Sequence, residues 1–469
     1  MAPFVLISVS LVGGATGLLF ALESFREKER RAPWAGLSAA MLFFLAGMLS
    51  WGFPALRWGI FFIYGVGILF LAVLFIPAPP RSKAPAGTAR CRVGAIHRFD
   101  ERDIVFARNR SLPPGSDPYR LYYSKYPERE SGDALRRSKG GPVGSIGLID
   151  KGFRPNVAMI EACFEMPVIF GPHAVKPHDG KRVPENLDPV HAAARIKEFA
   201  VHLGADLAGI CRVNPEWAYS HRGEIFFDNW KDWGKPIPEP LPFAVVIAVE
   251  MDRELVGAAP HTPTLLESAK NYAKGAYITT ILARWFSGMG FSAAAQHSRH
   301  YDLNLVPLAI DAGLGELGRF GFLITDRFGP RVRLFAVTTD MPLAPDAPAD
   351  FGVDSFCRHC LKCADACPSR AIPAGKKTIV NGIEKWRIDP ERCFDFWAKV
   401  GTDCSICMGI CPFSRPHRGF HRLARRMIRH SRVARATFPA LDNGIYGKRW
   451  HPRKVPAWVD YRDCTLRSG

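Results

Sequence analysis

Eight of the twelve cysteines in this 469-residue chain lie between positions 357 and 411, at spacings that suit metal ligation. The run CRHCLKCADACP has the C-x2-C-x2-C-x3-C-P pattern, in which three cysteines enclose a [4Fe–4S] cluster and the fourth serves another cluster. Cys393 and the run CSICMGICP supply a second set. The pattern predicts two crossed clusters, one held by Cys357, Cys360, Cys363 and Cys411 and the other by Cys367, Cys393, Cys404 and Cys407.

A pair of zinc sites is the competing interpretation of these cysteines, because zinc also accepts four thiolates. Both runs end in Cys-Pro, at Pro368 and Pro412, which favours ferredoxin-type iron–sulfur clusters. Clustered thiols also indicate metal binding and not the disulfide framework of a secreted protein. The first predicted activity is therefore electron transfer, and the cysteines alone do not identify a substrate.

Three apolar segments open the chain, at residues 3–22, 34–53 and 58–76. Each has about the 20 residues that cross a hydrocarbon core of about 30 Å as a helix. The alternative is a cleaved signal peptide followed by buried helices, but no basic region precedes the first segment. Basic residues follow the first and third segments, which by the positive-inside rule places the following domain in the cytoplasm. We expect a multi-pass protein of the bacterial inner (cytoplasmic) membrane with its catalytic domain on the cytoplasmic side.

Beyond the apolar segments, helical and strand patterns alternate and predict an α/β domain. PVHAAARIKEFAVHLG and LLESAKNYAKGAYITTILARWFSGMG have helical periodicity, while ADLAGICRV, PFAVVIAVEM and RVRLFAVTTDM indicate buried strands. The expected organisation is an anchor of three transmembrane helices at 1–78, a linker at 79–95, a catalytic domain at 96–350, a two-cluster ferredoxin-like module at 351–415, and a basic segment at 416–469 that packs on the catalytic domain.

The formal net charge of +18 raises the question of an anionic partner. In the basic segment, arginines recur at helical spacing and are predicted to share one face: Arg418, Arg422, Arg425, Arg429 and Arg432. No nucleic-acid recognition motif accompanies them, so we expect no nucleic-acid partner. A solvated helix face and contact with the anionic headgroups of membrane lipid are the two remaining interpretations.

Four segments around the cysteine module carry a family resemblance: RFDERDIVFAR, LPPGSDPYRLYYSKYPERE, NPEWAYSHRG, and VPLAIDAGLGELGRFGFLITDRFGPRVRLFAVTTDMPL. In these segments, spread over most of residues 95–450, the chain resembles the corrinoid-dependent reductive dehalogenases, to which the epoxyqueuosine reductases are related. The resemblance implies a nitroreductase-like α/β domain that binds cobalamin base-off and receives electrons from two [4Fe–4S] clusters. It further implies a small halogenated organic substrate and an electron donor that could be a quinol, a ferredoxin or a flavoprotein.

The resemblance also implies a catalytic tyrosine and a neighbouring cation. By spacing these fall on Tyr272 and Arg333, with Tyr277 and Arg331 as rival positions. Loss of halide from carbon leaves a centre that needs a proton, and a phenol is a poor acid until a cation stabilises its phenolate. A third family position, usually Asn near the halogen, falls on His300. The expected site therefore combines Tyr272 as proton donor, Arg333 as its electrostatic partner, and His300 in the pocket wall.

The glycine-dense stretch DAGLGELGRFG lacks the setting of a dinucleotide loop. The resemblance implies that Gly313 and Gly315 in this stretch lie near the corrin, where small residues allow backbone to approach a planar cofactor. Two other functions fit the same cysteines. One is an epoxyqueuosine-reductase-like cobalamin enzyme, against which the three apolar segments argue. The other is a membrane electron-transfer subunit that has no substrate of its own.

Overall fold

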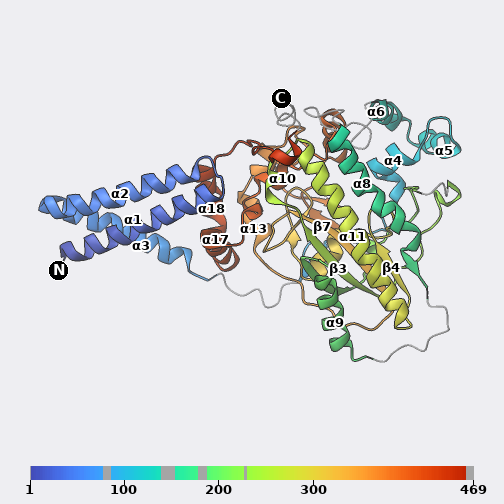
Figure 1. The fold of residues 1–469 in the computed structure, drawn as a ribbon, viewed down its shortest axis with the longest axis horizontal. Helices are drawn as coiled ribbons and strands as arrows, with labels where there is room; N and C mark the ends of the chain where they lie inside the picture. The colour runs from blue at the N-terminus through green and yellow to red at the C-terminus, as the bar shows by residue number, and fades with distance from the viewer. Residues whose placement is uncertain (1, 78–85, 139–153, 178–186, 227–229, 461–469) are drawn as a thin grey trace. The chain divides into compact units, whose positions relative to one another are not determined.

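The structure, a computed structural model, describes residues 2–77, 86–138, 154–177, 187–226 and 230–460 (Figure 1). The chain forms two compact units whose segments alternate in sequence. The anchor unit comprises Met1–Ser82, Phe351–Leu361 and Pro416–Arg449, and the core unit comprises Lys83–Asp350, Lys362–Arg415 and Trp450–Gly469. The first part of the expected linker, as far as residue 85, lies outside the described residues. The boundaries of the five expected segments stay predictions.

The anchor unit begins with α1 (Ala2–Arg26), α2 (Ala32–Gly52) and α3 (Arg57–Leu74). Each is long and apolar enough to cross a membrane by length and composition, as the sequence predicts. Small residues let α1 and α2 approach closely, because a Cβ on Gly17 would lie only 2.8 Å from the Ala40 nitrogen. The structure thus supplies three candidate membrane spans.

The rest of the anchor unit comes from distant parts of the sequence: α13 (Val353–His359), α17 (Gly419–His430) and α18 (Arg432–Tyr446). Leu74 at the end of α3 is buried in a cluster with Met427 of α17 and Ala434 of α18. The basic segment therefore packs on the apolar helices, which the sequence did not predict. Its expected contact with the catalytic domain stays a prediction.

A five-stranded sheet in the order β1-β4-β7-β3-β2 forms the centre of the core unit, and all of its pairings are antiparallel. The strands are β1 (Val175–Lys176), β2 (Leu207–Arg212), β3 (Phe243–Glu250), β4 (Ala293–Gln296) and β7 (Val332–Thr339). Three of them lie where the apolar runs predict strands. The expected mixture of helices and strands is confirmed.

Strand β3 separates two hydrophobic cores, which explains why nearly every residue in it is apolar. Val245, Ile247 and Val249 face one core, which also contains residues of α9 (Pro189–His202) and α11 (Thr262–Gly288). The alternate residues of β3 face a second core that includes α12 (Leu305–Asp311). The sheet is covered on both faces and forms a rigid support for side chains at its ends.

Helix α11 crosses the sheet in Figure 1, with α8 (Arg154–Phe170) beside it. A Cβ on Gly275 would lie 2.3 Å from the ring of Phe335, so only glycine allows α11 to approach β7 this closely. Since Tyr272 lies one turn earlier on α11 and Arg333 lies on β7, this close packing determines how near their side chains come.

Candidate functional site

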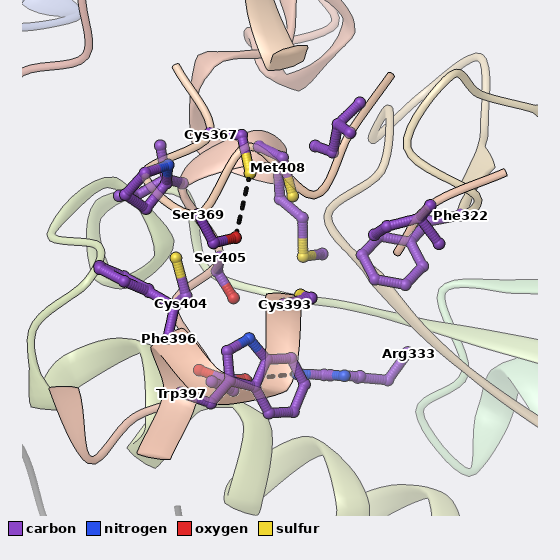
Figure 2. Close-up of a pocket in the computed structure, with 16 residues that line it drawn as sticks. Phe322, Arg333, Cys367, Ser369, Cys393, Phe396, Trp397, Cys404, Ser405 and Met408 are labelled. Atoms are coloured by element: carbon purple, nitrogen blue, oxygen red, sulfur yellow. Dashed lines mark hydrogen bonds and ion pairs between the residues drawn. The ribbon is translucent and has the colours of Figure 1, made fainter. Parts of the chain in front are cut away.

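Four of the eight clustered cysteines line one cavity of the core unit: Cys367, Cys393, Cys404 and Cys407. They come from the chain after α14 (Lys362–Asp365), from α15 (Pro390–Val400), from a loop, and from α16 (Ile406–Ile410). Figure 2 shows Cys367, Cys393 and Cys404 around one space, with Trp397 and Arg333 at its edge. This is the set that the crossed pattern predicts for one cluster.

The loop between α15 and α16 holds an unusual backbone. Cys404 and Ser405 have φ angles of 60° and 57°, a left-handed backbone conformation that residues other than glycine rarely adopt. The amide of Cys404 donates to Thr402 Oγ1 at 3.3 Å, and that hydroxyl donates to the carbonyl of Pro260 at 2.6 Å. Strain of this kind clusters at ligand-binding loops, where the surrounding structure maintains it.

Of the four cysteines of this cavity, Cys404 is buried and the other three are half-buried. Burial, together with the neighbouring thiol of Cys367, raises the pKa of Cys393 to about 12. Burial likewise raises the pKa of Cys404 to about 12. Thiolates at Cys393 and Cys404 therefore need the positive charge of bound metal, as an iron–sulfur cluster provides. Among the described residues, no three His, Cys, Asp or Glu side chains form a group suited to a single metal ion.

The other four cysteines are buried and belong to both units. Cys357 and Cys360 lie in the segment Phe351–Leu361 of the anchor unit, whereas Cys363 and Cys411 belong to the core unit. Their assignment to a shared cluster stays a prediction.

Tyr272 and Arg333, which the family resemblance singled out, meet in the structure. Arg333 Nη1 lies 3.3 Å from the Tyr272 hydroxyl, and its Cζ atom lies 5.1 Å from the centre of the ring. The two rivals lie elsewhere: Tyr277 is 43% exposed, and Arg331 donates from Nε to the carbonyl of Ser414 at 2.9 Å. The geometry brings together a phenol and a cation; their catalytic roles stay predictions.

Asp403, the residue before Cys404, holds Arg333 in place. Its Oδ2 accepts from Arg333 Nη2 at 2.6 Å, and the hydroxyl of Ser268 hydrogen-bonds to both groups. Burial opposes the charge on Arg333, but Tyr272 and Asp403 outweigh it and raise the pKa of the guanidinium above its ordinary value. One ion pair thus joins the cysteine loop to the tyrosine–arginine pair. Sequence reasoning missed Asp403 and Ser268, although a buried arginine beside a tyrosine requires a counter-charge.

His300 is not brought into this pair by any contact that the structure describes. Its Nδ1 lies 2.7 Å from the carbonyl oxygen of Ala295. Its neighbour Arg299, which sequence reasoning missed, has a Cζ atom 5.1 Å from the ring centre of Phe226. Burial and the charge of Arg110 lower the pKa of Arg299, while Tyr272 is close enough to act in the opposite direction. The place of His300 in a substrate pocket stays a prediction.

The two glycines expected near a corrin are tightly packed against protein backbone. A Cβ on Gly313 would lie 2.5 Å from the carbonyl oxygen of Ala347, and one on Gly315 would lie 2.4 Å from that of Ile324. Gly313 also has a φ of 75°, which favours glycine. Packing accounts for both residues, and their contact with a cofactor stays a prediction.

Comparison with known proteins gives the cysteine module and its neighbours a family context. Residues 356–414 match the family model described as a 4Fe-4S dicluster domain. The tetrachloroethene reductive dehalogenase of Sulfurospirillum multivorans is 32% identical over 300 residues, which cover 57% of this chain and 60% of that protein. The chain is a relative of the reductive dehalogenases. The solved structure of the catabolic reductive dehalogenase NpRdhA agrees, with a TM-score of 0.62, 26% identity and coverage of 80% of this chain and 50% of that one.

The similarity to epoxyqueuosine reductases is more limited. The epoxyqueuosine reductase of Lactococcus garvieae is 26% identical over 125 residues, covering 24% of this chain and 32% of that protein. The reductive dehalogenases match longer stretches at higher identity, but the chain spans only 60% and 50% of the two dehalogenases compared.

Proposed function

We propose that this protein is a membrane-anchored reductive dehalogenase that converts a small organohalide R–X, two electrons and one proton into R–H and X⁻. The observation that carries the proposal is the Tyr272–Arg333 pair, which Asp403 connects directly to the loop of the four-cysteine cavity. A proton donor and an electron-transfer centre are the two things that this reaction requires. The residues proposed for both roles lie in the core unit.

Iron–sulfur clusters fit the cysteines as they stand. One [4Fe–4S] cluster would be held by the four cysteines of the cavity, and a second by Cys357, Cys360, Cys363 and Cys411. The cavity wall is otherwise largely apolar, with Phe322, Ile372, Ile388, Phe396 and Trp397. A dry wall of this kind limits solvent access and so influences the reduction potential of a cluster.

A corrinoid fits buried polar groups of the core unit that have no partner, one of which belongs to Arg333. Arg333 Nε, His297 Nε2 and Ser298 Oγ are buried and have no hydrogen-bond partner within the described parts of the chain. Such groups suit a ligand with a hydrogen-bonding periphery, as the amide side chains of a corrinoid provide. When bound base-off in the proposed nitroreductase-like domain, the corrinoid would supply the reducing cobalt centre that acts on the carbon–halogen bond.

The residues of this chain then have separate roles. Tyr272 donates the proton to the carbon that loses halide, and Arg333 stabilises the phenolate that remains. Arg333 keeps its own charge throughout, because a guanidinium does not give up a proton in proteins. Asp403 and Ser268 hold Arg333 against the tyrosine ring. His300 is proposed to line the substrate pocket, and the three spans are proposed to hold the core unit on the cytoplasmic face of a bacterial inner membrane.

Anaerobic turnover in deuterium oxide tests the reaction. Reduced protein incubated with halogenated ethenes and phenols is expected to release one halide for each product molecule, and to place one deuterium on the dehalogenated carbon. A hydroxyl group at that carbon would indicate hydrolysis, and would overturn the reductive mechanism.

Asp403→Asn tests the ion pair separately. The amide lacks the charge that fixes Arg333, and a small displacement of a positioning group lowers turnover by roughly 100-fold. We expect kcat/KM for halide release to fall by that factor while iron and sulfide content stay unchanged. Asp365→Asn is the matched control, since Asp365 is an exposed acid two residues before Cys367 and is expected to leave the rate unaltered. Full activity of Asp403→Asn would show that the ion pair has no part in positioning Arg333.

A further inference from the structure

One side of α17 carries four exposed arginines, here called the basic face: Arg418, Arg422, Arg426 and Arg429. Their spacing of three or four residues places them on one side of the helix. Arg425, which the sequence placed among them, is instead buried at 5% exposure and lies 2.8 Å from the Nδ1 atom of His417. The basic face therefore contains Arg426 in place of the predicted Arg425, and all four of its arginines are exposed.

The start of α17 is joined to the ends of the apolar helices, and Arg418 takes part in this contact, with its Nε atom 3.6 Å from a carboxylate oxygen of Glu27. The ring of Phe420 makes an edge contact with Phe20 of α1, with 5.3 Å between the ring centres. His421 Nε2 lies 2.9 Å from a carboxylate oxygen of Glu27, which is almost completely buried just after α1. Together with the Leu74 cluster, these contacts place α17 at the end of the anchor where α1 and α3 finish.

This end of the anchor has the features of a membrane–water interface. Phe25 and Trp34 are 50% and 64% exposed and form an edge-to-face pair with ring centres 6.2 Å apart. Exposed aromatic rings at the ends of apolar spans mark the level of the lipid headgroups. The adjoining turn between α1 and α2 exposes further basic residues, namely Arg26, Lys28, Arg30 and Arg31. The basic face of α17 lies at this same end of the apolar helices.

We propose that the basic face binds the headgroups of anionic phospholipids and holds α17 along the membrane surface. The guanidinium groups of Arg422 and Arg426 make no hydrogen bond or ion pair with any residue that the structure describes, so they are available for phosphate. Guanidinium and phosphate form charge-assisted, two-point hydrogen bonds. The anchor places the basic face beside the surface of the leaflet, so anionic lipid is already present there. An acidic protein would have to reach the same surface and compete with that lipid.

The test measures amide hydrogen exchange of the full chain in lipid nanodiscs. One set contains phosphatidylcholine alone and the other a 3:1 mixture of phosphatidylcholine and phosphatidylglycerol. Each arginine near an anionic surface favours the bound state by about fivefold. We therefore expect the amides of residues 419–430 to exchange at least fivefold more slowly in the anionic discs, and the difference to shrink in 0.5 M salt, where such charges are screened.

Three variants make the result specific. Arg422→Gln/Arg426→Gln is expected to lose the lipid-dependent protection, and Arg422→Lys/Arg426→Lys to keep most of it. Arg120→Gln/Arg154→Gln removes two charges that are 65% and 75% exposed on the core unit and is expected to behave as the unmodified chain. Equal exchange of α17 in the two lipids, or full protection in the glutamine variant, would refute lipid binding by this face. The inference rests on the membrane anchor of the proposed function, whereas the readout does not involve dehalogenation, so failure of one is distinguishable from failure of the other.

Discussion

Tyr272→Phe is expected to reduce halide release by roughly 1,000-fold, because a positioned general acid contributes on the order of 10²- to 10⁴-fold to a rate. The substitution removes only the hydroxyl that faces Arg333. The ring itself is held by Phe164 and Phe335, whose centres lie 6.0 and 6.2 Å from it, so phenylalanine should occupy the same space. Folding and cluster content are therefore expected to be unchanged.

Measurement of halide release under anaerobic conditions, beside iron, sulfide and corrinoid content, checks this expectation. Tyr277→Phe is the matched control, because it removes a hydroxyl from an exposed tyrosine of the same helix and should leave the rate unaltered. A Tyr272→Phe protein that retains full activity and all of its cofactors would show that the proton comes from another group.

Cys407→Ala is expected to lose about half of the iron and acid-labile sulfide, since it removes one ligand from one of two proposed clusters. Halide release should fall below detection, because electrons could no longer pass through the cavity beside Arg333. The matched control is Cys163→Ala, a cysteine of α8 outside the module, which should keep both the metal content and the rate. A Cys407→Ala protein with its full iron content would contradict the assignment of this ligand.

The crossed arrangement has its own signature in the double variant Cys367→Ala/Cys407→Ala. If both cysteines hold the same cluster, the second substitution removes no more iron than the first. If each run of the sequence enclosed its own cluster, the double variant would lose nearly all of its iron. Iron analysis combined with electron paramagnetic resonance of the reduced protein distinguishes the two outcomes.

The features that the sequence predicted well are those encoded in short stretches. The cysteine spacing groups four cysteines that line one cavity, three apolar segments form three long helices, and three apolar runs form strands of the central sheet. The Tyr272–Arg333 pair came from family resemblance, since the two residues are far apart in the chain and no local pattern connects them.

The features that were missed depend on contacts between distant segments. Asp403 and Ser268 come from a cysteine loop and from α11, and only the packing of these elements brings both to Arg333. In α17 the arginine spacing alone placed Arg425 on the exposed face, but the packing of the helix on the anchor turns it inward. Periodicity identifies the faces of a helix and does not say which face a distant segment will cover.

The proposed function requires a corrinoid bound beside Tyr272, and its most direct test is the cofactor content of the 469-residue chain. After anaerobic purification and acid extraction, the visible spectrum of the extract should show a corrinoid, with iron and sulfide in amounts that correspond to two [4Fe–4S] clusters. Iron and sulfide without corrinoid, in protein produced with corrinoid available, would contradict the dehalogenase assignment and favour an electron-transfer subunit.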